Sequence, residues 1–436
     1  MYKPKVIKKL LPTTKVILTN YGWLVGDRLA RMAIGLYVAT KVARYLGPEN
    51  YGELAYVLSY LAFFQAVVTL GLDVIVIRRL SGAKENHGKI LGTTAALRII
   101  SGFIGFFTVI VVQLGTDGIS ADRTLLLALA GGVLVIQAAD TIDLWFQSQS
   151  QNKKTVLAKL FAYMLGSSIK LILVSIGAGV SAFAGVIAVE ALIVALALAN
   201  AYKSFSTNER WSFDRSTAVS IVREGFPFML TALSTMIYMR IDQVFIAKYL
   251  NSESLGFYAA ASLLSSLWHF LPVTLVAALA PHFSKLYDRS LADFYTELGR
   301  IFRLFFFIGL IASIVTNIAA SFLINQLFGS HYKPAIDILR VHVLTNIFIC
   351  LGVAQTLWLV NKGLGRLSVY RTLIGAILSV VLNYIFIEKY GLITVAWIAV
   401  VAQAGSAVIS NAIFAPKIFI LQLAAMFQFK NKKNGI

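Results

Sequence analysis

The sequence predicts an all-α integral membrane protein with twelve transmembrane helices, and three observations support this fold class: the composition, the length of the apolar stretches, and the placement of basic residues between them. The chain has 436 residues, of which 58% are hydrophobic and 14% charged, with a mean hydropathy of +0.76. Such a chain needs lipid around it. Lipid offers no partners to backbone amides, and the apolar stretches lack the ten-residue alternation of a barrel, so the spans are predicted to be helices.

Twelve apolar stretches reach the roughly 20 residues that a membrane-spanning helix needs. A basic segment precedes the first stretch, which is too long for a signal-peptide core and has no small-residue cleavage site, so we expect an uncleaved first span. The predicted spans are 20–43, 54–77, 90–112, 124–145, 156–176 and 180–202 in the first half, and 226–249, 255–279, 304–327, 335–359, 367–386 and 392–414 in the second.

Basic residues are distributed very unevenly between the two sets of connecting segments. With a cytoplasmic N-terminus, the cytoplasmic segments and both tails hold 27 Lys and Arg residues, whereas the opposite loops hold 5. This is the positive-inside pattern, which an odd number of spans would have scrambled. We therefore expect a multi-pass protein of the cytoplasmic (inner) membrane with both termini in the cytoplasm, and we attribute the formal charge of +19 to topology rather than to nucleic-acid binding.

The second half of the chain repeats the first. A shift of 204 residues places residues 43–55 over residues 247–259, with six of the thirteen positions identical. Two six-span halves that both begin inside form a parallel repeat, and such halves usually enclose a central substrate path. The predicted domains are an N-terminal six-helix lobe (1–202), a basic cytoplasmic linker (203–223), a C-terminal six-helix lobe (224–416) and a basic tail (417–436), which we expect to lie on the inner leaflet as an amphipathic segment.

The sequence gives no sign of a metal site or a nucleotide cofactor. The single cysteine, Cys350, lies in an apolar stretch, and the five histidines show no metal-ligand spacing. No phosphate-cradling glycine motif occurs, so we expect no cofactor. Energy would come from an ion gradient, with H⁺ or Na⁺ as the coupling ion, or from removal of the product.

Two groups of segments resemble a known family. Residues 42–54 (VARYLGPENYGEL) and 69–78 (TLGLDVIVIR), together with residues 224–227 (EGFP), 240–243 (RIDQ) and 250–258 (LNSESLGFY), resemble the Wzx-type polysaccharide-biosynthesis flippases. These belong to the MATE/MOP superfamily, which also includes drug exporters and peptidoglycan-precursor flippases. The resemblance implies two six-helix bundles in a V. It also implies transport of polyprenyl-pyrophosphate-linked oligosaccharide units, such as O-antigen or lipopolysaccharide repeat units, with a polymerase and a chain-length regulator as partners.

Basic residues within the spans are the first candidates for a site, because a charge near the bilayer centre costs about 2.5–3.5 kcal/mol on insertion scales and needs a cavity or a partner. Arg28 and Arg31 share one face of span one, Arg240 lies in span seven and Arg98 in span three. The planar guanidinium can hold phosphate oxygens with paired hydrogen bonds. We predict that these four arginines bind a pyrophosphate headgroup, although each could instead pair with an acid.

Acidic residues within the spans are the second group of candidates. Asp27 lies four residues before Arg31 and Asp242 lies beyond the middle of span seven, while Asp140 and Asp143 belong to a polar stripe on span four that includes Gln137 and Gln147. Coupling to an ion and hydrogen bonding to sugars are the functional interpretations, and neutralisation of nearby basic residues is the structural one. Two further interpretations are structural: an ion pair between Lys170 and Glu190, and a local charge cluster of Asp73 with Arg78 and Arg79.

Three functions remain open at this point. A lipid-linked oligosaccharide flippase fits the excess of arginines within the spans. A MATE-like exporter of cationic drugs would need an acidic, aromatic cavity. A membrane polymerase or ligase of glycan units would need sizeable outer loops, and those predicted here are short. The first function is therefore favoured, and the protein is expected to be a transporter rather than an enzyme.

Overall fold

The computed structural model describes residues 7–82, 86–116, 121–207 and 209–427, and in the first helix it describes the side chains of Leu29 and of the residues from Arg31 onwards. All elements in these ranges are helices. The first half contains α1 (Ile7–Val68), α2 (Asp73–Leu80), α3 (His87–Thr116), α4 (Ala121–Gly131), α5 (Val133–Ile136), the 3₁₀ helix η1 (Gln137–Ala139), α6 (Asp140–Ser148), α7 (Asn152–Ser175) and α8 (Val180–Lys203).

The second half is longer and more interrupted. It contains α9 (Arg215–Tyr249), α10 (Ser252–Ser266), the 3₁₀ helix η2 (Leu267–His269), α11 (Phe270–Arg289), α12 (Leu291–Leu327), the 3₁₀ helix η3 (Ser330–Tyr332), α13 (Ala335–His342), α14 (Thr345–Ala354), α15 (Thr356–Asn361), α16 (Gly365–Tyr390), α17 (Leu392–Ala404), the π-helix η4 (Gly405–Ile409), α18 (Ser410–Phe414) and α19 (Pro416–Phe427).

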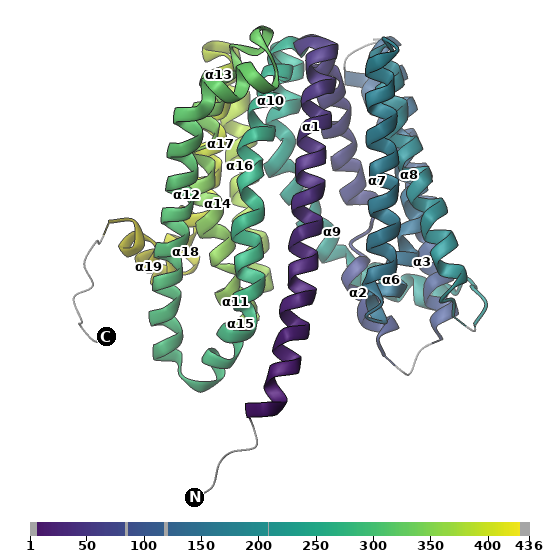
Figure 1. Cartoon of the computed structure of the whole chain (residues 1–436), viewed down its shortest axis with the longest axis vertical. Helices are drawn as coiled ribbons and strands as arrows, with labels where there is room; N and C mark the ends of the chain where they lie inside the picture. The colour runs from purple at the N-terminus through teal and green to yellow at the C-terminus, as the bar shows by residue number, and fades with distance from the viewer. Residues whose placement is uncertain (1–6, 83–85, 117–120, 208, 428–436) are drawn as a thin grey trace, which may run out of the picture.

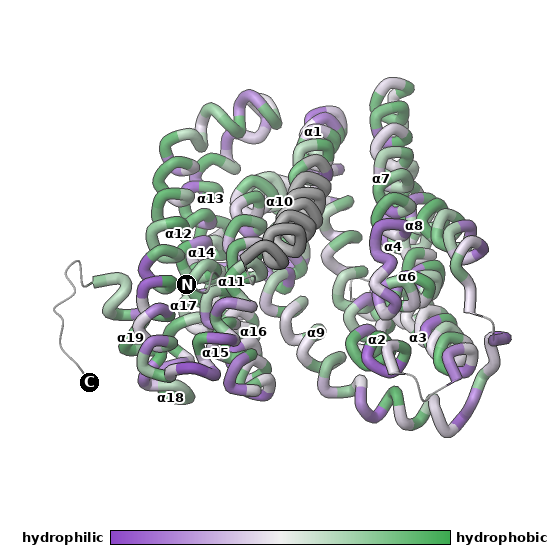
Figure 2. Tube along the Cα trace, turned by 60° about the horizontal axis from the view of Figure 1, so that its bottom comes forward, coloured by the Kyte–Doolittle hydropathy of each residue, from purple (hydrophilic) through white to green (hydrophobic). Residues whose placement is uncertain are grey.

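The long helices run roughly along one axis and form two groups, with α1 between them (Figure 1). Along most of these helices the chain is hydrophobic (Figure 2). Ten helices of the described ranges are long and apolar enough to cross a membrane. They confirm an all-α membrane fold. The count of twelve stays a prediction, because α1 joins the first two predicted spans and α9, which holds the seventh, is not among the ten.

The first two predicted spans are separated by a kink rather than by a loop. Gly47 breaks α1 with φ 73° and ψ 171°, a conformation that glycine adopts without steric penalty. The second predicted span, 54–77, is wrong at its end. Its helix stops at Val68, and Leu70 (φ 53°) and Gly71 (φ 63°) then form a turn that leads into α2. The sequence 69–78 (TLGLDVIVIR) is mostly apolar, and the two positive φ angles mark the point where the elements separate.

The two halves approach each other most closely where α1, after its kink, crosses α10. A Cβ atom on Gly52 would lie 1.8 Å from the carbonyl oxygen of Ser252, and one on Gly256 would lie 1.9 Å from the carbonyl oxygen of Pro48. The shift of 204 residues relates Gly52 to Gly256 and Pro48 to Ser252. The contact is therefore reciprocal, as a two-fold axis between the halves would require. Only glycine lets the backbones approach this closely.

Polar contacts reinforce this crossing at the predicted outer end of the molecule, the upper end in Figure 1. Arg123 of α4 forms an ion pair with Glu53 of α1 at 3.0 Å, and its Nη2 donates to the Ser252 hydroxyl at 3.1 Å. Ser252 also donates to Glu53, and Tyr332 of η3 donates to the Ala43 carbonyl at 2.9 Å. A carboxylate of one half thus holds a hydroxyl of the other.

Several of the predicted spans are interrupted helices. The fourth contains η1, the eighth contains η2, and the tenth breaks between His342 and Thr345. The shift of 204 residues places η1 on residues 341–343, at the break in the tenth span, so the two halves interrupt equivalent helices. Discontinuous helices of this kind often form binding sites near the membrane midplane.

The predicted linker and tail both contain parts of helices, α9 and α19. The linker ends early, because α9 starts at Arg215 with the Asp214 side chain as its N-cap. The tail prediction of a surface-lying segment is corrected for α19, since Gln422 is fully buried and bonds to Asn411 at 2.9 Å, which in turn bonds to Gln355 at 3.0 Å. A buried amide network therefore holds α19 on the second half. Residues 428–436 lie outside the described ranges.

Replacing Gly52 by alanine tests the crossing. The added methyl group must push α1 and α10 apart, and overpacking of this kind costs about 1–3 kcal/mol, so we expect a lower thermal unfolding midpoint for purified G52A. Gly185 of α8 provides the control, because a Cβ there has no atom within 4 Å. Equal midpoints for G52A and G185A would show that the crossing is not tightly packed.

Replacing Gln422 by leucine tests the docking of α19. The Asn411 amide would lose a partner in a buried setting at a cost of about 1–3 kcal/mol, so α19 would detach more often and trypsin would cleave after Lys417 about ten times faster. I420A is the control, because Ile420 is 64% exposed. Unchanged cleavage of Q422L, measured by mass spectrometry, would show that the amide network does not hold the helix.

Candidate functional site

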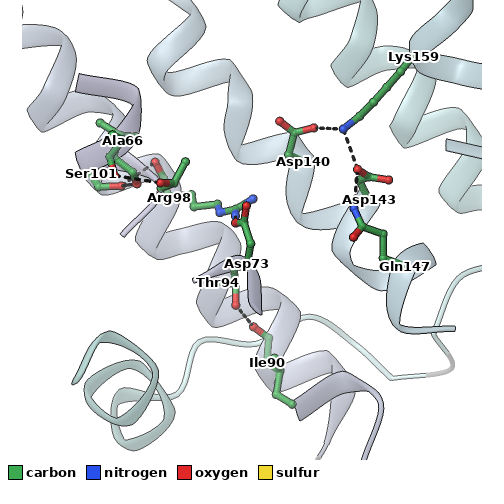
Figure 3. A network of polar contacts seen from close by, with 12 residues as sticks. Ala66, Asp73, Ile90, Thr94, Arg98, Ser101, Asp140, Asp143, Gln147 and Lys159 are labelled. Atoms are coloured by element: carbon green, nitrogen blue, oxygen red, sulfur yellow. Dashed lines mark hydrogen bonds and ion pairs between the residues drawn. The ribbon is translucent and has the colours of Figure 1, made fainter. Parts of the chain in front are cut away.

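A polar cavity of about 130 Å³ lies inside the first half. Its charged lining consists of three carboxylates and two cations, contributed by α2, α3, α6 and α7, and Figure 3 shows how these side chains face one another. Two amides, Gln137 and Gln147, complete the polar part of the wall. The polar stripe predicted on span four therefore faces into the helix bundle. The charged residues are Asp73, Arg98, Asp140, Asp143 and Lys159.

Arg98 and Asp73 form one side of the cavity. Arg98 is 3% exposed, and its Nη2 donates to Asp73. The predicted charge cluster of Asp73 with Arg78 and Arg79 is wrong, because the turn at Leu70 and Gly71 directs Asp73 toward α3 while both of those arginines pair with Glu224 of α9. Arg98 therefore has its own acid, and its role in pyrophosphate binding stays a prediction without added support.

Lys159 joins the two aspartates on the other side. Its ammonium lies 2.8 Å from Asp140 Oδ1 and 2.7 Å from Asp143 Oδ2, and Gln147 donates to Asp143 at 3.0 Å. One lysine thus compensates two carboxylates. Lys159 is the basic partner that the structural interpretation of these two aspartates requires. Ion coupling and hydrogen bonding to sugars stay predictions.

The cavity still has one carboxylate more than it has cations, and two of its polar atoms lack partners. The Nε atom of Arg98 and the Nε2 atom of Gln137 are buried and make no hydrogen bond within the part of the chain that the structure describes. Buried polar groups without partners are rare in proteins. Such a site can take up a proton, a small cation or a hydroxyl group, and it is too small for a drug-sized molecule.

Of the two arginines predicted in span one, the structure describes the side chain of Arg31. The side chains of Arg28 and Asp27 lie outside the described residues. Arg31 donates from Nη2 to the Val156 carbonyl at 3.1 Å and lies over the Tyr163 ring, whose hydroxyl donates back to the Arg31 carbonyl at 3.1 Å. Arg31 thus contacts α7 of its own half.

Arg240 of span seven is exposed, although it lies well inside α9. It makes no hydrogen bond or ion pair with any other described residue, and it lies within electrostatic reach of Tyr51 on α1. Counting 1.5 Å per residue, Arg240 lies about 13 Å from the outer end of α9 and Arg31 about 24 Å from the kink in α1. A cargo moving outward would therefore reach Arg31 first and Arg240 second.

Asp242, the fourth predicted acid, is buried, whereas Arg240 two residues earlier is exposed. It is 7% exposed, accepts a hydrogen bond from Tyr258 of α10, and accepts another from the backbone N–H of Gln243 at 2.8 Å. Gln243 in turn accepts from Ser59 of α1 at 2.5 Å. The RIDQ segment therefore presents its arginine outward and its acid and amide inward.

Sequence reasoning missed Arg371. It lies in α16, is 6% exposed, and donates from Nε to the Ser406 carbonyl of the π-helix η4 at 3.1 Å. It has no carboxylate partner among the described residues. Its position four residues inside the eleventh predicted span was the available signal.

The predicted ion pair of Lys170 with Glu190 is confirmed, and its atoms lie 2.7 Å apart.

Outside the spans, Glu224 connects the start of α9 to α2. The hydrogen bond from Arg79, together with the charges of Arg79 and Arg78, holds the pKa of this carboxyl below its usual range.

The described residues contain no group of three or more His, Cys, Asp or Glu side chains that could hold a metal ion.

Comparison with known proteins identifies relatives of this chain. A family described as "Polysaccharide biosynthesis protein" matches residues 17–287. The succinoglycan biosynthesis transport protein ExoT of Rhizobium meliloti is 22% identical over 281 residues, which are 63% of this chain and 56% of ExoT. The chain thus spans about half the length of that relative.

Two solved structures share the fold. The lipid II flippase MurJ in an inward closed conformation has a TM-score of 0.71 and 15% identity, with 93% of both chains covered. A multidrug resistance MATE family transporter of the MOP superfamily, in an inward-facing conformation, has a TM-score of 0.69 and 18% identity over 90% of this chain and 96% of the other. At these identities the likeness shows the fold, and it confirms the all-α membrane architecture.

Replacing Lys159 by methionine tests the charge balance of the cavity. Two carboxylates would lose charge-assisted hydrogen bonds, each worth about 1.5–3 kcal/mol, so we expect a lower thermal unfolding midpoint that the second change D143N partly restores. K153M is the matched control, because Lys153 is exposed in the first turn of the same helix. If D143N lowered the midpoint of K159M further, the proposed charge balance would be wrong.

Proposed function

Because the chain belongs to the polysaccharide biosynthesis protein family, we propose that it is a flippase of the cytoplasmic membrane. Its cargo is a polyprenyl-pyrophosphate-linked oligosaccharide unit, which it moves from the inner to the outer leaflet by alternating access. The observation that carries this proposal is Arg240, an exposed guanidinium without a partner among the described residues, on a helix that contacts both halves. Persistent charges within spans normally face a cavity or a partner.

Charge complementarity supports an anionic cargo. A pyrophosphate carries negative charge on several oxygens, and a guanidinium can donate to two of them at once. Arg240 faces α1 of the first half, where Arg31 lies deeper along the helix. A headgroup moving outward would exchange one arginine for the next, while the lipid tail stays in the membrane.

The cavity in the first half supports coupling to an ion. Its single excess carboxylate gives it affinity for a proton or for Na⁺, and Asp140 and Asp143 are the residues that would respond. Lys159 occupies the space between them, so an incoming cation would have to displace its ammonium. This competition favours a proton, which can bind to a carboxylate without displacing the lysine.

A MATE-like exporter of cationic drugs is the second candidate, and the acidic excess of the cavity favours it. The volume of about 130 Å³ argues against it, because sites for drug-sized ligands measure about 300–1,000 Å³. Raised resistance to cationic dyes on overexpression would support this second function. A polymerase and a chain-length regulator are the partners that a flippase would need to complete surface polysaccharide.

Replacing Arg31 and Arg240 by alanine, one at a time, tests the anionic cargo. In a strain that depends on this protein, R240A should lower surface polysaccharide about tenfold or more, and R240K should retain part of the export because a lysine keeps the charge but not the paired bonds. R300A is the control, since Arg300 is exposed and pairs with Glu297. Full export by R31A and R240A at unchanged protein level would contradict an arginine role in cargo binding.

A further inference from the structure

The second half contains a buried cluster of ionisable groups that the proposed transport does not yet use. Asp242 of α9 accepts a hydrogen bond from Tyr258 of α10, which is fully buried. The Tyr258 ring meets the His342 imidazole edge to face, with ring centroids 5.5 Å apart and an interplanar angle of 87°. His269 of η2 is an electrostatic neighbour of His342. An acid, a phenol and two imidazoles thus form one group.

Both imidazoles have a buried nitrogen without a partner. Nδ1 of His342 and Nε2 of His269 make no hydrogen bond within the described ranges. Asn346 lies within hydrogen-bonding reach of the His269 ring, and its amide also donates to the Ser265 carbonyl at 3.2 Å. A neutral imidazole keeps one lone pair, and in such a position that lone pair is available to a proton.

The charge of the cluster is not balanced from within. Asp242 is its one acid among the described residues, and the charged group outside the cluster that acts on both Asp242 and Tyr258 is Arg240. A buried carboxylate is costly without a counter-charge. The hydrogen bonds from Tyr258 and from the Gln243 backbone stabilise the Asp242 carboxylate first, and the positive charge of Arg240 adds to them. Arg240 is also the residue that is proposed to hold the cargo.

We propose that Asp242, His342 and His269 form a proton-binding site that is linked to anion binding at Arg240. The proposal rests on the function proposed above. When an anion neutralises Arg240, Asp242 loses its counter-charge and the cluster takes up one proton from water. That proton binds to a nitrogen lone pair of His342, and no other bond is formed or broken. Linkage is reciprocal, so a protonated cluster binds the anion more tightly.

The histidines lie where the backbone can move. His342 is the last residue of α13 at the break in the tenth span, and His269 is the last residue of η2, just before Pro272. Proline removes one intrahelical hydrogen bond, and 3₁₀ segments within helices often mark hinges. The break next to His342 is equivalent to the one next to Asp140 in the first half, so each half has ionisable groups at its interrupted fourth helix.

Histidine NMR of the full-length protein tests the linkage without any cargo. The chain has only five histidines, so ¹³C-labelled imidazoles can be assigned with the single variants H269Q and H342Q. R240Q imitates an arginine neutralised by its anion. We expect the titration midpoint of His342 to rise by about one pH unit in R240Q, a tenfold gain in proton affinity, and to stay unchanged in R300Q.

Two results would overturn the linkage: a His342 resonance that does not titrate between pH 4 and 9, or the same midpoint in R240Q and the wild-type protein. Loss of the His342 shift in the double variant R240Q/D242N is expected, because the carboxylate transmits the change.

A binding experiment separates this proposal from the function on which it rests. The probe is citronellyl pyrophosphoryl N-acetylglucosamine, a diester that does not itself titrate near neutral pH. Calorimetry in buffers of different ionisation enthalpy should show proton uptake on binding to the wild-type protein, and binding without uptake in H342Q. No binding to the wild-type protein would contradict the proposed cargo, whereas binding without uptake would contradict only the linkage.

Discussion

The reciprocal approach of two backbones at Gly52 and Gly256 is the contact on which the arrangement of the halves depends. It fixes α1 against α10 at the predicted outer end, and the Glu53–Arg123–Ser252 contacts hold them there. Because α9 leads directly into α10, this crossing also determines that Gln243 reaches Ser59 of α1 and that Arg240 faces the first half. The placement of Arg240 is therefore linked to the close packing of two glycines, of which Gly256 follows it along the chain.

The charged residues within the spans are paired differently in the two halves. In the first half, Arg98 and Lys159 have carboxylate partners, so the cavity is a nearly balanced network that can change by one charge. In the second half, Arg240 and Arg371 have no carboxylate partner among the described residues, while Asp242 bonds to a tyrosine instead of an arginine. Unpaired cations suit a negatively charged cargo, and a nearly balanced network suits an ion that drives the change between conformations. This division of roles is consistent with the flippase function proposed above.

Apolar length, the distribution of basic residues and the 13-residue repeat were sufficient to predict an all-α membrane fold. The repeated segments proved to contain the residues that meet between the halves, a contact that the sequence did not predict. The residue that pairs with each charged or buried polar side chain was harder to predict. Asp73 is five residues from Arg78, but two positive φ angles at Leu70 and Gly71 direct it to Arg98, and the apolar sequence there does not reveal that turn. Hydropathy also could not place Arg371 or Gln422, because a buried polar residue is recognised by its partner and that partner is distant in sequence.

A single distance measurement bears most directly on alternating access about the Gly52–Gly256 crossing. Glu49 and Glu253 are exposed, are related by the shift of 204 residues, and flank the crossing, so spin labels on E49C and E253C, with C350S removing the native thiol, report its separation. Double electron–electron resonance should show one short distance in the free protein and a second, longer population when the pyrophosphate-sugar probe is added. A single unchanged distance in protein that still transports the probe would contradict opening at this end.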